Sequence, residues 1–292
     1  MHFNNQRQSI MRRKLLVLSI LLGTQQLSSC KSISPNEALL SSSENAEVSK
    51  YKKIQFRSEK GSIKTLHLVE VSLMKSVSIE VRSEEDYEEN SIISPSTFSK
   101  ENNLHVSLNA NFYEKNNTPI GLVYSKGQKW NTSEKALYDP ATVLICTYEN
   151  TCEIKKENEL NGNESIYNLV TGYPLLVSKG SPLDFKNMDL HPRSAIGIDK
   201  TGTKLYFVST DGRAVDVLGG GKKVDGFSFA ELAKALANEG IYNALNLDGG
   251  GSSNLIYKGR RLNMRRAVNP IEHPDQIFHE RKVPVTIGVK LN

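Results

Sequence analysis

Several signatures of common protein classes are absent from this sequence of 292 residues. It has no run of basic residues and no basic patch with interleaved aromatics, so nothing in it favours nucleic-acid binding. The glycines at 249–251 are not followed by the lysine of a Walker motif, and no Gly-x-Ser-x-Gly elbow occurs. These absences argue against nucleotide hydrolysis and against serine-esterase chemistry.

The N-terminus has the pattern of an export signal. Arg12, Arg13 and Lys14 precede an apolar run, Leu15–Gly23, that is too short to span a bilayer. The run ends in Leu-Ser-Ser-Cys30, which resembles the lipobox of bacterial lipoproteins, although an ordinary secreted protein is the alternative. We predict a signal peptide over residues 1–29 and a lipid on Cys30.

Removal of residues 1–29 changes the charge of the chain. Four basic residues and no acidic ones lie there, so the formal charge falls from +5 to +1. A nearly neutral mature chain gives no support to a nucleic-acid partner. Residues 30–50 are polar and predict a tether, followed by one domain over 51–292. The expected location is the bacterial cell envelope, on the periplasmic face of the outer membrane or on the cell surface.

Two cysteines remain when Cys30 is set aside. Cys146 and Cys152 flank five residues, and the strands predicted on either side could bring them together across a hairpin. A disulfide is plausible outside the cytoplasm, whereas a zinc site needs more ligands than this neighbourhood supplies. We predict a disulfide, no metal and no cofactor.

Short segments rich in Val, Ile, Leu and Tyr predict many strands, with turn residues between them that indicate hairpins. The expected fold class is α+β, a mixed and largely antiparallel sheet with flanking helices in a single domain. One helix is well marked, because Ser228-Phe-Ala-Glu231 forms a capping box and Gly240 ends the apolar pattern. The strands are predicted at Ile63–Leu73, Val77–Val81, Leu104–Asn109, Gly121–Ser125, Ala141–Tyr148, Cys152–Lys156, Ala195–Ile198, Lys204–Ser209 and Tyr242–Leu247.

The candidate chemistry lies where the last of these strands ends. Asp248 is followed by Gly249, Gly250 and Gly251, whose bare backbone could approach a phosphate or a sugar, and by the hydroxyls of Ser252 and Ser253. Taken alone, this segment could equally be a tight turn.

Other polar residues stand at strand ends. Arg193 could grip two phosphate oxygens, although a surface arginine is often only solvated, and His191 is as often a packing residue as a proton donor. Asp211 and Gly212 end a further strand, and Asn109 ends an earlier one. A second glycine run at 219–223 is better interpreted as a mobile loop than as a ligand clamp.

The order of these segments resembles the phosphodiester glycosidase family. The resemblance rests on Leu108–Tyr113, His191–Gly197, Asp211–Arg213, Phe227–Ala233, Asn246–Ser253 and Glu280–Val285, and it covers about residues 104–291. Around Asn109 the family often has two glycines where this chain has Ala110 and Asn111. The residues that fall on family motif positions are Asn109, Arg193, Asp211, Gly212, Asn246, Asp248, Gly249, Gly250, Gly251, Ser252 and Arg281, and His191 matches many bacterial members.

The resemblance implies hydrolysis of the bond between a sugar's anomeric carbon and a phosphodiester. Arg193, with Arg281 and the loop amides, would hold phosphate, and Asp248 or Asp211 would direct water or stabilise the reacting carbon. Asn109 and Asn246 would bind sugar hydroxyls. Two alternatives are a binding module that recognises phosphorylated glycans without cleaving them and a structural envelope lipoprotein.

Overall fold

A computed structural model describes residues 47–57, 62–82, 91–133, 141–212, 214–216, 222–264 and 280–292. All of them belong to one compact unit, Glu47–Asn292, which begins four residues before the predicted domain start. The predicted signal peptide, Cys30 and most of the tether lie outside the described residues, as do Arg213 and the glycines at 219–221.

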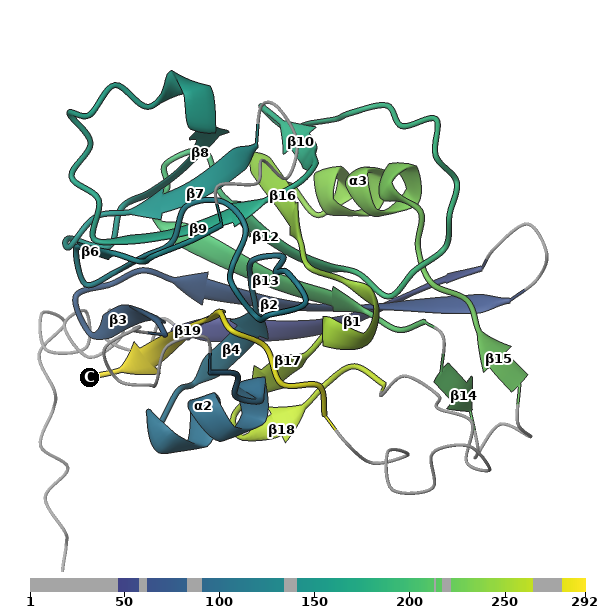
Figure 1. Cartoon of the computed structure of the whole chain (residues 1–292). Helices are drawn as coiled ribbons and strands as arrows, with labels where there is room; N and C mark the ends of the chain where they lie inside the picture. Colours follow the sequence, from purple (N-terminus) through teal and green to yellow (C-terminus); the bar gives the residue numbers. More distant parts are fainter. Residues whose placement is uncertain are drawn as a thin grey trace, which may run out of the picture. The chain divides into compact units, whose positions relative to one another are not determined.

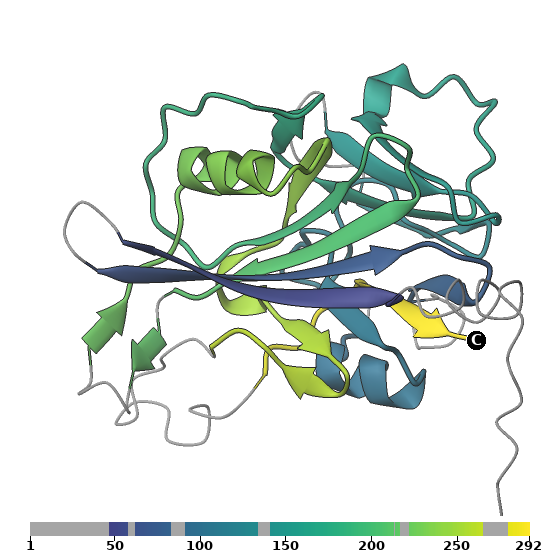
Figure 2. The same ribbon diagram turned by 180° about the vertical axis from the view of Figure 1, so that it is seen from behind.

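The largest sheet has seven strands in the order β1-β2-β13-β12-β16-β10-β11, and every neighbouring pair is antiparallel. Figure 2 shows its long first hairpin, in which β1 and β2 run side by side. The strands span β1 Ser49–Arg57, β2 Ile63–Ser72, β10 Leu175–Ser178, β11 Ser181–Pro182, β12 Ser194–Ile198, β13 Lys204–Thr210 and β16 Asn243–Leu247.

Two five-stranded sheets and a small two-stranded one, β14-β15, complete the β-structure. The first has the order β18-β17-β4-β19-β3 and the second β6-β5-β9-β7-β8. Their strands are β3 Val77–Val81, β4 Val106–Asn109, β5 Tyr124–Ser125, β6 Gln128–Lys129, β7 Thr142–Cys146, β8 Cys152–Lys156, β9 Asn168–Gly172, β14 Ala214–Asp216, β15 Lys222–Val224, β17 Leu255–Tyr257, β18 Arg260–Arg261 and β19 Thr286–Leu291.

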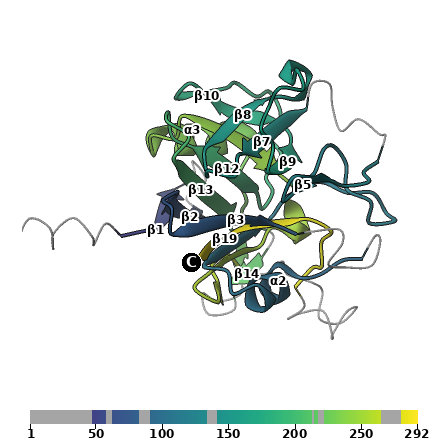
Figure 3. The same ribbon diagram turned by 90° about the vertical axis from the view of Figure 1, so that its left-hand side faces the viewer.

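The period-two pattern of the central strands places apolar side chains on both faces of the seven-stranded sheet. On β13, Leu205 and Phe207 join a core shared with both five-stranded sheets. Tyr206 and Val208 on the same strand join a second core, which includes Leu232 of helix α3. The sheet is therefore covered on one face by α3 and on the other by the smaller sheets (Figures 1 and 3).

Helix α3, Phe229–Asn238, starts at the predicted capping box. The Ser228 hydroxyl accepts from the amide of Glu231, whose carboxylate accepts in return from the amide of Ser228. Helix α2, Pro95–Glu101, packs against β4, β17 and β19 (Figure 1). Two 3₁₀ turns, η1 Glu157–Glu159 and η2 Gly250–Ser252, complete the elements. None of the helices described is long and apolar enough to cross a membrane.

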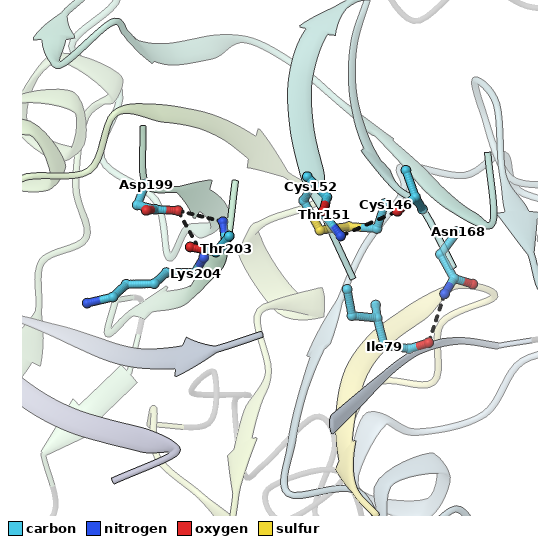
Figure 4. The surroundings of a disulfide bond; sticks show 9 residues. Ile79, Cys146, Thr151, Cys152, Asn168, Asp199, Thr203 and Lys204 are labelled. Carbon is cyan, nitrogen blue, oxygen red and sulfur yellow. Dashed lines mark hydrogen bonds between the residues drawn. A yellow bond between two sulfur atoms is a disulfide. The ribbon is translucent and has the colours of Figure 1, made fainter. Parts of the chain in front are cut away.

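The predicted hairpin disulfide is present. Cys146 and Cys152 face each other in the β7-β8 register and are joined by a bond between their sulfur atoms (Figure 4). The amide of Cys152 also donates to the Gly202 carbonyl in the β12-β13 turn, at 2.9 Å. Nearby, the amide group of Asn168 donates to the Ile79 carbonyl at 2.8 Å (Figure 4). These bonds attach the sheet that contains the hairpin to both neighbouring sheets.

The predicted fold class is confirmed, with differences in detail. Every strand pairing described is antiparallel, and the only parallel contact in these ranges is an isolated bridge between Ile120 and Ser133. The segment 49–57 forms an edge strand, which the sequence analysis did not predict. The strand predicted over Gly121–Ser125 is reduced to Tyr124–Ser125.

Candidate functional site

The polar strand ends predicted from the sequence meet at one edge of the seven-stranded sheet. Strand β12 lies between β13 and β16, and Ser194 pairs with both Ser209 and Leu247. The start of β12 therefore adjoins the ends of its two neighbours, as Figure 1 shows. Asp211 and Asp248 follow those ends two strand spacings apart, which corresponds to roughly 10 Å.

The neighbouring five-stranded sheet reaches the same edge through the end of β4. The amide of Asp248 donates to the Ala110 carbonyl at 2.9 Å, and the amide group of Asn109 donates to the Asp248 carbonyl at 2.5 Å. The Asn109 oxygen accepts from the Ser194 hydroxyl at 2.8 Å and from the amide of Asn254 at 3.0 Å. The main chain of Asp248 is therefore fixed by both sheets.

Glycine is required in the loop that follows because other backbone lies against it. The amide of Gly250 donates to the Pro192 carbonyl at 2.8 Å, and a Cβ on Gly249 would lie 2.8 Å from the same oxygen. A Cβ on Gly251 would lie 2.7 Å from the guanidinium carbon of Arg281. The loop thus packs on the start of β12, and its third glycine makes room for an arginine.

The carboxyl group of Asp248 is enclosed although the residue keeps partial exposure. Burial raises its pKa to about 6, against the opposing effects of a Ser252 hydrogen bond, the Arg281 charge and the Gly249 amide. A carboxyl group with this pKa exchanges its proton near neutral pH, which suits acid–base chemistry.

Three buried oxygens around the loop have no hydrogen-bond partner among the described residues. They belong to the side chains of Asn246, Ser253 and Asn254. Buried polar atoms are nearly always paired, so such a group close to a candidate site needs an explanation. A bound molecule or ordered water could supply the missing partners.

Asp211 belongs to a second buried network on the far side of β12. Its carboxylate accepts from the amide of Met264 at 2.7 Å and lies 3.3 Å from the Nε2 atom of His67. The Nδ1 atom of that imidazole is 2.8 Å from the Tyr51 hydroxyl. Because Asp211 is only 2% exposed, this arrangement favours a role in fixing the end of β13 over direct contact with substrate.

Arg193 is also engaged by the protein itself. Its Nε donates to the Phe227 carbonyl at 3.0 Å and its Nη2 to the Asp189 carbonyl at 2.9 Å, with the Phe229 ring 3.8 Å from the guanidinium carbon. Its exposed fraction is 8%. These contacts hold the 189–193 segment against the start of α3, and the predicted phosphate contact of Arg193 stays a prediction.

The remaining predicted site residues differ in their exposure to solvent. Asn109, Asn246, Gly212 and Ser252 are buried, and the Ser252 side chain is hydrogen-bonded to the Asp248 carboxyl group. The amide group of Asn246 donates to the Tyr173 and Leu247 carbonyls. Burial favours positioning roles for both asparagines over the sugar contacts suggested by the sequence. His191 is half-buried and pairs with Phe227 through its main chain.

The loop amides predicted to hold phosphate differ in their contacts. The amides of Gly250 and Ser252 donate to the carbonyls of Pro192 and Gly249. A Cβ on Gly212 would lie 2.7 Å from the Cα of Gly226, so Gly212 serves close packing. Among the predicted site residues, Arg281 is exposed, and His191, Asp248 and the three loop glycines keep partial exposure.

No group of three His, Cys, Asp or Glu side chains suited to a metal ion occurs within the described ranges. A surface hollow of about 680 Å³ lies at the start of β4 rather than at its end. Its lining includes Ser96, Lys100, His105 and Lys258, and none of the predicted site residues. The chemistry of the glycine loop therefore gives the better candidate site than the hollow does.

The sequence analysis missed Glu280 and Asn254. The carboxylate of Glu280 accepts from the Asn254 side chain and from the amide of Ser96, the latter at 2.9 Å. Glu280 stands directly before Arg281 in a segment quoted for the resemblance, but nothing in its spacing indicated a partner. Asn254 directly follows the two serines, and its adjacency to the loop was the signal available.

The fold and its site define a class, an α+β protein with an enclosed carboxyl group beside an exposed arginine where two sheets meet. A family model described as phosphodiester glycosidase matches residues 102–290. The chain belongs to the phosphodiester glycosidase family, whose members are hydrolases of this type.

Individual relatives are distant. An uncharacterized SPbeta prophage-derived protein of Bacillus subtilis (strain 168) is 26% identical over 212 residues, which are 63% of this chain and 30% of that protein. The chain thus spans under a third of that relative's length.

Among solved structures, the catalytic domain of zebrafish N-acetylglucosamine-1-phosphodiester alpha-N-acetylglucosaminidase, auto-inhibited by its pro-peptide, is similar with a TM-score of 0.66. It is 19% identical, and the match covers 85% of each chain. A hypothetical protein from Synechocystis is similar with a TM-score of 0.56 and 17% identity, covering 84% of this chain and 62% of that one. At these identities the likeness shows the fold alone.

Proposed function

We propose that this protein hydrolyses the bond between a sugar's anomeric carbon and the phosphate of a phosphodiester, with Asp248 as the reacting acid–base group. The observation that carries the proposal is the enclosed Asp248 carboxyl group, whose pKa is raised to about 6 where the ends of β12, β13 and β16 meet. The proposed products are a free sugar and a phosphomonoester.

The proposed hydrolysis needs only one carboxyl group with a strongly shifted pKa. When the carbon–oxygen bond breaks, the electron pair goes to a phosphate oxygen, which needs less protonation than a sugar alkoxide does. Above pH 6 the Asp248 carboxylate accepts a proton from water as the water oxygen bonds to the anomeric carbon. That proton then passes to solvent, which balances the reaction.

Arg281 is the cation placed to hold the phosphate. It is exposed, it lies against Gly251, and its charge lowers the pKa of Asp248 against the effect of burial. Arg193 contributes indirectly by fixing the backbone at Pro192 on which the loop rests. The unpartnered oxygens of Asn246, Ser253 and Asn254 support the presence of a bound molecule or ordered water around the loop.

We also propose that the protein is exported and held in the bacterial envelope by lipid on Cys30. The signal-peptide pattern and the Cys146–Cys152 disulfide support this, because disulfides persist in oxidising compartments. Mass spectrometry of the mature protein should detect diacylglycerol on Cys30, and a Cys30→Ser variant should lack it. An unmodified Cys30 in the exported wild type would refute the anchor.

The activity is tested with the p-nitrophenyl phosphodiester of N-acetylglucosamine 1-phosphate and with the corresponding glucose and mannose compounds. Release of reducing sugar should rise with pH through about 6 as Asp248 ionises. Binding of a phosphorylated glycan without turnover in any of these assays would instead support the binding-module alternative.

A further inference from the structure

Glu280 occupies a fixed position between helix α2 and the glycine loop. Its carboxylate accepts from the amide of Ser96 at 2.9 Å and from the hydroxyl of the same serine. It also accepts from the side-chain amide of Asn254. A carboxylate with three donors directed at it is held firmly, because hydrogen bonds to an ionised acceptor are the stronger kind.

The chain of contacts continues to the reacting acid. The main-chain amide of Asn254 donates to the Asn109 side-chain oxygen at 3.0 Å, and Asn109 donates in turn to the carbonyl of Asp248. Asn254 and Asn109 are at most 1% exposed. Glu280 and Asp248 are therefore connected through buried side chains that have little freedom to move.

The position of Arg281 depends on the hydrogen bonds that hold Glu280. The arginine side chain is exposed and makes a long contact, 3.5 Å from Nη1 to the Ser252 hydroxyl. A long cationic side chain in solvent samples many rotamers. The firm attachment of the adjacent Glu280 keeps the arginine backbone where the guanidinium can lie on Gly251.

We infer that Glu280 is a positioning residue for the proposed hydrolysis, holding Arg281 over the glycine loop by binding α2 and Asn254. The inference rests on the proposed function. It extends the site to α2, a helix that contributes no side chain to the predicted chemistry. Removal of the Glu280 side chain frees Arg281 from its position over the glycine loop and leaves the apolar cores unchanged.

The test compares Glu280→Ala with Glu280→Gln in the full chain, using the N-acetylglucosamine probe. Alanine removes all the acceptors, and kcat/KM should fall 10- to 100-fold because small misplacements of binding groups are costly. Glutamine keeps one acceptor and should lower kcat/KM by three- to tenfold. The matched control is Glu149→Gln, an exposed glutamate in the β7-β8 turn, which should act like wild type.

A merely structural role would lower activity without moving the pH profile. Displacement of Arg281 removes a charge that lowers the pKa of Asp248, so the acid limb of the alanine variant should move above pH 6 by at least half a unit. An unchanged limb in the alanine variant would overturn the inference, whatever the change in kcat/KM. If alanine prevents folding, an unshifted limb in the glutamine variant, with activity within threefold of wild type, overturns it equally.

The pKa of Asp248 can also be followed without catalysis, from the pH dependence of unfolding in each variant compared with its Asp248→Asn double mutant. An inactive wild type would refute the proposed function, while a shifted pKa in Glu280→Ala would still support the placement of Arg281. An active wild type with an unshifted pKa in the variant would refute the placement alone.

Discussion

Replacement of Asp248 by asparagine should stabilise the protein at neutral pH while it abolishes turnover. Because burial raises the folded-state pKa from 3.8 to about 6, the native protein holds its proton where the unfolded chain has lost it. Stability therefore falls as the pH rises through the window from about 4 to 6. Relative to a carboxyl group with an unshifted pKa, this shift lowers the free energy of unfolding by up to about 3 kcal/mol above pH 7 and by only about 0.5 kcal/mol at pH 4.

The assay is urea unfolding of wild type and Asp248→Asn at pH 4 and pH 7.5, with reducing-sugar release measured in parallel. The variant should gain up to about 3 kcal/mol at pH 7.5, which corresponds to roughly 6–12 °C in Tm, and almost nothing at pH 4. Exposed Asp184→Asn is the control and should change stability by less than about 0.5 kcal/mol at either pH. Equal effects of Asp248→Asn at both pH values, or near-wild-type turnover, would refute the reasoning.

Three further changes test other parts of the structure. Arg193→Lys should lower the free energy of unfolding by about 2 kcal/mol and reduce activity, because lysine cannot donate to both backbone carbonyls. A stable variant with wild-type activity would contradict this. Gly251→Ala should displace the flexible end of the Arg281 side chain and reduce kcat/KM at least tenfold with little loss of stability. Unchanged kinetics would count against the role of that arginine. The double substitution Cys146→Ala and Cys152→Ala should lower the free energy of unfolding by only about 2 kcal/mol, because the loop closed by the disulfide is short. Failure of this variant to fold would show that the disulfide contributes more stability than the entropy of closing that loop.

Sequence patterns identified most of the fold because local signals and tertiary packing agree. The β7-β8 hairpin, the disulfide and the capping box before α3 each depend on residues close together in the chain. The edge strand β1 was missed: its first two residues lie in the predicted tether, and its alternation of charged and apolar residues follows directly after that polar stretch. The division of the strands into four sheets depends on long-range packing, which residue periodicity does not contain.

The candidate site was predicted in its location but not in the orientation of its side chains. Strand-end positions brought Arg193, Asp211 and Asp248 to one edge, as expected. Which of them faces solvent depends on partners far along the chain, such as His67 for Asp211 and the Phe227 carbonyl for Arg193. No spacing in the sequence encodes those contacts, so burial had to come from the structure.

The central claim is cleavage of the bond between the anomeric carbon and oxygen, and hydrolysis in ¹⁸O-labelled water tests it most directly. Wild type is incubated with the p-nitrophenyl phosphodiester of N-acetylglucosamine 1-phosphate, and the phosphomonoester product is analysed by mass spectrometry. The proposed mechanism predicts a phosphomonoester without the label, since water bonds to carbon. Label in the phosphate would place the attack at phosphorus, and a wild type that releases no product from any of the sugar phosphodiesters would contradict the proposed function itself.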